Sequence, residues 1–216
     1  MTVRLNIGCG QSPTEGWINY DDSFAVRMAG SPLLTWAMRR TGLADAGNLE
    51  FAAVARACGI RHADAARRIP HGDGSVDAIY SSHMIEHLDR REARGFLAEC
   101  RRVLRPRGML RLAVPDVSLP VRDYLADGDA DVFLEQLQFD LDRPRGIRGR
   151  LRHLLTGGGR GHRWMYDKRS LRTLVEAAGF MEIETLPPGR TRIADPGRLD
   201  LAERPEESIY LEAVRP

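Results

Sequence analysis

Two glycines and two acids near the start of the chain are the first residues whose types and spacing suggest chemistry. Gly8 and Gly10 follow a short apolar run, and Asp21 and Asp22 close the next apolar run. Glycine has no Cβ, so a turn built from it lets a ligand approach the backbone closely. A glycine-rich turn after a first strand therefore indicates a nucleotide-like ligand.

The spacing after this turn argues against a dinucleotide. That fingerprint needs a third glycine where this chain has Pro13, and an acid about 20 residues further on, whereas Asp21 comes much sooner. The sequence Ser12-Pro13-Thr14-Glu15 is typical of a helix start, so we expect the helix between the first two strands to be cut to a single turn.

A third suggestive run is His83-Met84-Ile85-Glu86-His87. On a helix this spacing would place both histidines on one face, as in the inverted zinc proteases. The run follows a predicted strand of a nucleotide-type sheet, which argues against a protease. Glu86 and His87 can instead cap and pack the following loop, and we expect no bound metal.

Seven short segments are the candidate strands that position these residues. Two of them, "DAIYSS" and "MLRLAVPD", are apolar runs bounded by polar residues, glycine or proline, as expected of strands covered on both faces. The seven segments are Arg4–Ile7, Trp17–Tyr20, Arg61–Ala63, Val76–Ser81, Gly108–Val114, Phe180–Leu186 and Ser208–Val214. Two amphipathic runs predict helices. The first carries its apolar face from Ala93 to Leu104 and stops at Pro106 and Gly108, and the second covers residues 167–180.

The alternation of strands and helices predicts an α/β fold with a mostly parallel sheet. The last two predicted strands are joined without a clear helix, so an antiparallel C-terminal strand is expected. Residues 23–60 and 117–164 exceed what the sheet needs. We expect them to be helical insertions that cover the ligand crevice at the carboxyl ends of the strands, with extra core packing as the alternative. Residues 1–216 are treated as one domain.

Composition excludes several classes of protein but indicates no partner. The chain has 216 residues and a net charge of +2. Cys9, Cys58 and Cys100 are widely spaced and odd in number, which is typical of free thiols in a reducing compartment. The chain enters its first strand without a leader, and no apolar run approaches the roughly 20 residues that span a bilayer. We therefore expect a cytoplasmic protein without a membrane span.

The order of the motifs resembles one family. The pattern "LNIGCG … GWINYD … ADAARRIPHGDGSVDAIYSSHMIEHL … LAECRRVLRPRGMLRLAVPD" is similar to class I S-adenosylmethionine-dependent methyltransferases. It looks most like the small bacterial type often associated with glycan and secondary-metabolite gene clusters. The resemblance covers residues 3–116, and "HRWMYDKRSLRTLVEAAGF" extends it. It implies a Rossmann-like sheet, methyltransferase activity and S-adenosylmethionine (SAM) as cofactor.

The resemblance also implies where SAM binds. Asp21, with Asp22 as the alternative, would hold the ribose hydroxyls, and Asp64 would lie beside the adenine edge. The cofactor-lining residues as a set are Gly8, Cys9, Gly10, Asp21, Asp22, Asp64, Ala65, Ser81, Ser82 and His83. Some methyltransferases of this class carry E-x-x-E-H after the fourth strand and bind a divalent ion. Here His83 replaces the first glutamate, and the expectation of no metal stands.

Methyl transfer from a sulfonium mainly requires alignment of the two reactants, and a general base is needed when the acceptor is a hydroxyl or a protonated amine. The candidates are His83, Asp116 and His162, with Tyr166 to orient the acceptor. We favour His162 as the acceptor contact, because it follows the glycines at 157–159 and 161 that could act as a hinge. Its alternative role is to cap the next helix.

The acceptor is expected to be a small molecule. From Arg143 to Arg163 the chain has seven arginines and no acid, which suits an anionic acceptor or, equally, a solvated loop. No basic helix or aromatic stacking series accompanies it, so nucleic acid is disfavoured. We expect methylation of a hydroxyl on a sugar, glycolipid or natural product. The alternatives are a non-catalytic cofactor-binding scaffold and an RNA methyltransferase.

Overall fold

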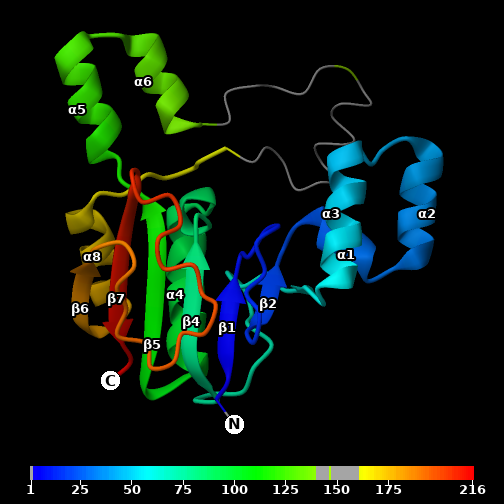
Figure 1. Ribbon diagram of the computed structural model, residues 1–216, viewed down its shortest axis with the longest axis horizontal. Coiled ribbons are helices and arrows are strands. Elements are labelled where there is room, and N and C mark those ends of the chain that lie inside the picture. The colour runs from blue at the N-terminus through cyan, green and yellow to red at the C-terminus, as the bar shows by residue number, and fades with distance from the viewer. Residues whose placement is uncertain (1, 140–145, 147–160) are drawn as a thin grey trace.

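The computed structural model describes residues 2–139, 146 and 161–216. These residues contain a seven-stranded sheet in the order β3-β2-β1-β4-β5-β7-β6 (Figure 1). Its strands are β1 (Arg4–Ile7), β2 (Ile18–Asp21), β3 (Arg61–His62), β4 (Val76–Ser82), β5 (Leu104–Pro115), β6 (Met181–Leu186) and β7 (Ser208–Val214). β7 pairs antiparallel with both β5 and β6, and the other pairs are parallel. The predicted fold class is confirmed.

The strand order places a topological switch point beside β1. From β1 the chain moves outward through β2 to β3, and it then returns to the opposite side of β1 to form β4 and β5. Neighbouring connections therefore leave the sheet in opposite directions between β1 and β4. In open α/β sheets this is where ligands bind, outside the carboxyl ends of the strands.

Two helices cover one face of the sheet. The helix α4 (Arg90–Val103) buries the predicted apolar face that includes Phe96 and Cys100, and α8 (Lys168–Ala177) buries Leu171 and Val175. Both begin with a capping box, at Asp89 and at Asp167.

The predicted end of the first of these helices was wrong. α4 ends at Val103, and Leu104 already pairs with Val76 as the first residue of β5. Pro106 therefore lies inside an irregular start of the strand, where the register with β4 shifts. The sheet pairing of Leu104 outweighed the helical periodicity that had placed it on α4.

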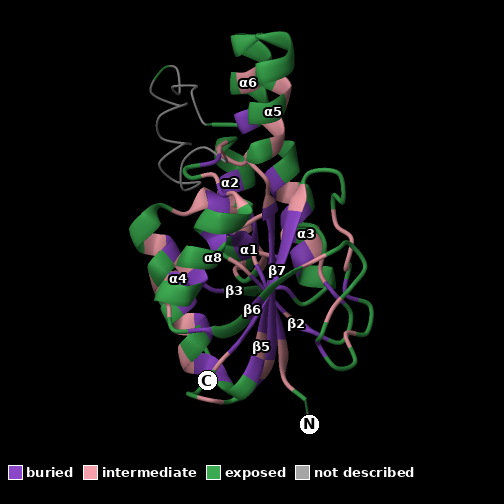
Figure 2. Cartoon of the chain, turned by 90° about the vertical axis from the view of Figure 1, so that its left-hand side faces the viewer, coloured by how far each residue is buried: buried purple, intermediate pink, exposed green. Residues whose placement is uncertain are grey.

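An irregular segment, residues 187–207, packs on the opposite face. Its Ile193 and Leu199 share an apolar cluster with Trp17, Tyr80 and Tyr210. The strands are thus buried from both sides, but by helices on one side and by a loop on the other. Figure 2 shows these buried strands at the centre of the molecule, with exposed helix surfaces outside them.

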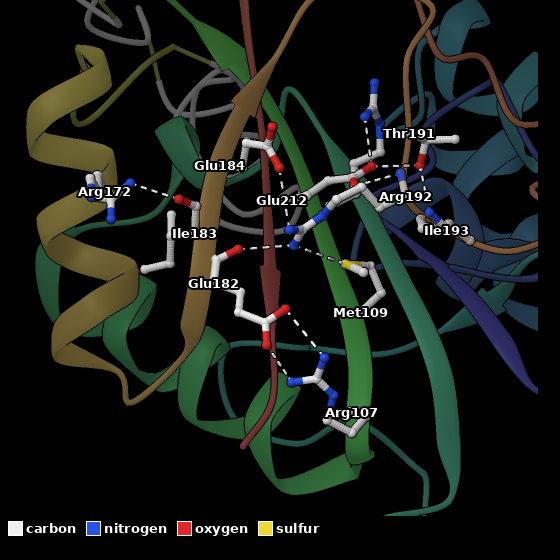
Figure 3. Close-up of polar contacts among 11 residues, drawn as sticks. Arg107, Met109, Arg172, Glu182, Ile183, Glu184, Thr191, Arg192, Ile193 and Glu212 are labelled. Carbon is white, nitrogen blue, oxygen red and sulfur yellow. Dashed lines mark hydrogen bonds and ion pairs between the residues drawn. The ribbon is translucent and has the colours of Figure 1, made fainter.

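A buried ion pair holds this irregular segment against the sheet. Arg111 of β5 and Glu212 of β7 are both fully buried, with Arg111 Nη1 2.9 Å from Glu212 Oε1. Arg111 also donates to the carbonyl oxygens of Arg190 and Leu201. Glu212 accepts hydrogen bonds from the Thr191 hydroxyl and the Arg192 amide, as Figure 3 shows.

The segment between β1 and β2 departs from the prediction. Residues 8–17 form successive turns, closed by hydrogen bonds from Ser12 N to Cys9 O and from Trp17 N to Thr14 O, where one helical turn had been expected. Asn19 replaces the capping box, because its side chain accepts from Thr14 N and donates to Thr14 O and Trp17 O.

Both predicted insertions contain helices among their described residues. The first comprises α1 (Phe24–Ala29), which the sequence had not indicated, α2 (Pro32–Thr41) and α3 (Ala46–Ala57), and it encloses a core of its own that includes Cys9. The second contains α5 (Ser118–Asp127) and α6 (Ala130–Leu137), which pack on each other. The first lies beside β2 and β3, and the second rises beyond the carboxyl end of β5 (Figure 1). No helix among the described residues has the length and apolarity to cross a membrane.

The Arg111–Glu212 pair gives a stability prediction. Arg111→Met would leave the buried Glu212 carboxylate with its two neutral donors and the partly exposed Arg192 guanidinium, whose Nε lies 3.7 Å from Oε2. Losing the fully buried cation is expected to lower the free energy of unfolding by about 3 kcal/mol. Urea denaturation measures this. The control is Arg122→Met, which removes an exposed pair with Asp123 and should cost less than about 1 kcal/mol. Equal losses in the two variants would contradict the assigned role of the buried pair.

Candidate active site

The glycine turn is fixed to the end of β2 by its own backbone. The amides of Gly8 and Cys9 both donate to Tyr20 O, at 2.8 and 3.1 Å. Gly8 and Gly10 have φ angles of +72° and +51°, in the left-handed region that favours glycine. The amide of Gly10 donates to Asp21 Oδ2 at 3.0 Å, so the two predicted ligand elements are joined directly.

The two glycines face different surroundings. A Cβ on Gly8 would overlap the Met84 side chain, which packs against the turn. A Cβ on Gly10 would meet nothing within 4 Å among the described residues. Gly8 is therefore required by packing, whereas Gly10 borders open space through which a ligand can reach the backbone.

The structure separates the roles of the two acids that follow. Asp21 accepts from the backbone amides of Gly10 and, through Oδ1, of Ser23 at 2.8 Å. Asp22 Oδ1 instead lies 2.8 Å from both Arg27 Nη2 and His62 Nε2. Asp21 thus belongs to the glycine turn, and Asp22 belongs to the charged edge of the first insertion.

Asp64 and Ala65 follow β3, as predicted, and β3 pairs in parallel with β2 so that His62 lies opposite Asp21. The carboxylate of Asp64 lies 3.2 Å from Arg67 Nε, and Ala65 is buried. A cleft of about 840 Å³ separates this turn from α1 and α3. Asp64, His62 and Arg27 are among its lining residues.

The end of β4 presents polar groups without partners. Ser81 and Ser82 are buried, and neither hydroxyl has a hydrogen-bond partner among the described residues. His83 follows with φ +46°, a conformation uncommon for a residue with a Cβ. Its Nε2 lies 3.0 Å from the Ser208 hydroxyl of β7.

The segment 161–166, which we call the strap, crosses the carboxyl ends of β4 and β5. The amides of Arg163 and Trp164 both donate to Glu86 O, at 2.7 and 3.1 Å. The Val117 amide donates to Tyr166 O, and the His162 amide donates to Gln138 O. The strap therefore ties the 3₁₀ turn η1 (Ile85–His87) to both arms of the second insertion.

Through the strap, His162 is brought against η1. His162 is buried, its Nδ1 lies 2.9 Å from Leu137 O, and its ring centroid lies 5.1 Å from that of His87. Burial lowers the pKa of His162 below its ordinary value. The side chain of His162 is thus enclosed beside Glu86 and His87 rather than at an open rim. The predicted hinge glycines at 157–159, and the arginines from 143 to 160, lie outside the described residues.

Asp116 and Tyr166 meet at the end of β5. They form a parallel β-bridge, and Asp116 Oδ1 accepts from the Ser118 amide and hydroxyl at 3.0 and 2.6 Å. Tyr166 is buried, which raises the pKa of its phenol to about 12. Asp116 thereby holds Ser118, the first residue of α5, and Tyr166 remains protonated at neutral pH.

The predicted residues fall into three groups. The turn at Gly8–Gly10, Asp21 and the end of β4 flank the switch point. Asp22, Asp64 and Ala65 lie toward the first insertion. His162 and Tyr166 belong to the strap, and His83 and Asp116 lie beside it. Sequence reasoning had treated Glu86 and His87 as a loop cap and had not placed His162 beside them. The isolated sequence carries no signal for that contact, because it depends on the backbone pairing of the strap with η1.

The comparisons with known proteins agree with this geometry. A family model described as a methyltransferase domain matches residues 5–112, about half of the chain. A SAM-dependent methyltransferase from Thermotoga maritima has 15% sequence identity and a TM-score of 0.52, over 100% of this chain and 83% of that one. A SAM-dependent methyltransferase from Methanosarcina mazei also has 15% identity and a TM-score of 0.52, over 98% and 91%. No curated protein matches.

The chain therefore belongs to the family of SAM-dependent methyltransferases, and SAM is its cofactor. The residues present fit that cofactor. The open space at Gly10 admits a ligand to the backbone. The hydroxyls of Ser81 and Ser82, which have no partner in the described part of the chain, lie at the neighbouring strand end. The expected family, fold and cofactor are confirmed.

The two glycines predict different losses of stability. Gly10→Ala adds only the cost of a left-handed backbone, about 1–2 kcal/mol. Gly8→Ala has the same backbone cost and also displaces Met84, which should add about 1–3 kcal/mol. Thermal or urea unfolding of both variants measures the difference. Equal losses would mean that Met84 does not pack against the turn.

Cys9 provides a chemical probe of the same turn. Burial, and to a lesser degree the negative charge of Asp21, raises the pKa of its thiol to about 12, so the reactive thiolate is scarce at pH 8. Cys58 is exposed. Brief maleimide treatment of the folded protein at pH 8, followed by peptide mass spectrometry, should label Cys58 and leave Cys9 free. Rapid labelling of Cys9 would show that the turn is not packed against the first insertion.

Proposed function

We propose that the protein transfers the methyl group of SAM to a small-molecule acceptor, a hydroxyl of a sugar, glycolipid or natural product. The observation that carries this proposal is the position of the strap. It holds proton-accepting and hydrogen-bonding side chains over the carboxyl ends of β4 and β5, directly beside the polar end of β4. A small acceptor held under the strap would therefore lie next to the cofactor.

The chain's own residues would hold SAM on both sides of the switch point. Gly8, Cys9 and Gly10 would supply the backbone surface for the methionine part. Each carboxylate oxygen of Asp21 accepts one backbone amide and keeps a lone pair for a ribose hydroxyl. Asp64 and Ala65 would border the adenine, with Asp22 kept in its ion pairs, and Ser81, Ser82 and His83 would line the other side.

When bound, SAM supplies a methyl group already activated by its sulfonium. The protein then has to align the acceptor, exclude water and take up a proton from a hydroxyl acceptor. We propose that His162 contacts the acceptor, with His83 and Asp116 as the further groups able to take a proton. Tyr166, protonated at neutral pH, would orient the acceptor by donating a hydrogen bond.

The cofactor assignment is tested with a matched pair of variants. Asp21→Asn keeps one of the two oxygen acceptors, which can still bind the Gly10 amide, and removes the charge that favours the ribose hydroxyls. The Ser23 amide then loses its side-chain acceptor, so the folded state of the variant is checked by thermal unfolding. Calorimetric titration with SAM should show at least about tenfold weaker binding, since charge-assisted hydrogen bonds contribute about 1.5–3 kcal/mol. Asp22→Asn removes the charge from the neighbouring acid and should bind within about twofold of wild type, because its partners are Arg27 and His62.

The outcomes of this titration show which acid binds the ribose of SAM. A larger loss of SAM affinity in Asp22→Asn than in Asp21→Asn would assign the ribose hydroxyls to Asp22 instead of Asp21. Gly10→Ala is the third variant, since its Cβ would enter the space assigned to SAM without touching the protein. Unchanged binding in Gly10→Ala would place the cofactor elsewhere.

The acceptor class is tested by turnover. Incubation with SAM and panels of hydroxylated sugars, glycolipids and natural products, read out as formation of S-adenosylhomocysteine, should give product from at least one panel. SAM binding without turnover on any panel would instead favour a non-catalytic scaffold. Turnover confined to RNA, with binding that falls steeply with salt, would favour an RNA methyltransferase.

A further inference from the structure

Three side chains that can bind a metal ion meet where the strap crosses η1. The ligand atoms of Glu86, His87 and His162 all lie within 4.8 Å of one another. Ligand atoms bound to one ion at about 2.1 Å lie about 3–4 Å apart, so small side-chain rotations would bring these three onto a common centre. The site would join the strap to the turn after β4.

The buried carboxylate of Glu86 lacks a hydrogen-bond donor among the described residues. Glu86 is fully buried, and neither of its oxygens has a hydrogen-bond partner within the described part of the chain. Among the residues that the structure describes, the nearest basic atom is Nδ1 of His83, 3.4 Å from Oε1, and it too is buried without a hydrogen bond there. Buried carboxylates are normally paired or coordinate a metal, because the bare charge is costly to bury.

The two histidines are held ready to coordinate. Nδ1 of His87 lies 3.2 Å from Gly161 O, and Nδ1 of His162 lies 2.9 Å from Leu137 O. A carbonyl oxygen can only accept, so both Nδ1 atoms must carry the ring proton. Each Nε2 then keeps its lone pair. Metal-binding histidines commonly donate their other ring N–H to a carbonyl in this way.

We infer that Glu86, His87 and His162 bind a divalent transition-metal ion of the zinc class. Two imidazoles with one carboxylate favour Zn²⁺ over Mg²⁺, which prefers oxygen ligands. Three protein ligands also leave a coordination position open, as in catalytic rather than structural zinc sites. This inference replaces the sequence-based expectation that no metal binds.

The open position suggests what the ion does, and this step rests on the proposed function. The site follows Ser82 and His83 at the end of β4, so an acceptor oxygen held at the ion would lie beside the cofactor-lining residues. His162 would then contact the acceptor through the ion rather than take up its proton. The ion-binding site itself depends only on the three ligands and their hydrogen bonds.

The test is a cobalt titration of the full chain, prepared without a histidine tag and treated with a chelator. Co²⁺ is the probe because its visible ligand-field absorption reports imidazole coordination directly. The wild type should take up one equivalent with intense absorption, and Zn²⁺ should abolish that absorption by displacement. Absorption typical of the hydrated ion alone would overturn the proposal.

Matched variants assign the ligands. His87→Gln and His162→Gln should each bind Co²⁺ roughly tenfold or more weakly. The control is His71→Gln, whose ring lies 3.1 Å from the Tyr20 hydroxyl and outside this cluster, and it should bind like wild type. Equal binding by His162→Gln and His71→Gln would contradict the site.

A further variant guards against a simple folding defect. His162→Cys keeps a ligand atom on the strap and should bind Co²⁺ with a new thiolate-to-metal absorption in the near ultraviolet, which a merely structural histidine would not give. Binding without that absorption would remove His162 from the ligand set. SAM affinity, titrated separately on the metal-free wild type, tests the cofactor site independently, so failure of one proposal is distinguishable from failure of the other.

Discussion

The hydrogen bond from the Gly10 amide to Asp21 is the contact on which the proposed cofactor site depends. It joins the turn after β1 to the end of β2, and it can form because Gly8 and Gly10 adopt left-handed backbone angles. The same bond orients the Asp21 carboxylate beside the open space at Gly10. One short contact thereby places backbone, carboxylate and free volume together at the switch point of the sheet.

The two faces of the sheet that carries this edge are covered by different kinds of structure. Helices α4 and α8 bury one face, but the segment 187–207 buries the other. A loop forms fewer regular backbone hydrogen bonds than a helix. Here Arg111 and Glu212 instead form hydrogen bonds with backbone groups of the segment 187–207. The additional helices are concentrated at the carboxyl edge, where α5 and α6 rise from the end of β5 (Figure 1).

Most of the sheet could be predicted from the sequence because its strands are short apolar runs with clear boundaries, and β1 and β7 match to the residue. The errors occurred where tertiary contacts outweigh local pattern. Leu104 follows the helical period but pairs with Val76, and residues 12–15 resemble a helix start but are held as turns by Asn19. The contact of His162 with Glu86 and His87 could not be predicted, because it joins distant segments through backbone pairing.

Hydrogen–deuterium exchange with and without SAM tests the central claim, that the cofactor lies across the switch point between β1 and β4. The account predicts slower exchange in peptides that contain the turn at residues 8–10 and the end of β4 at residues 81–83, with little change in α8 on the covered face of the sheet. Protection confined to α5 and α6, or absent from residues 8–10 despite saturating SAM, would contradict it.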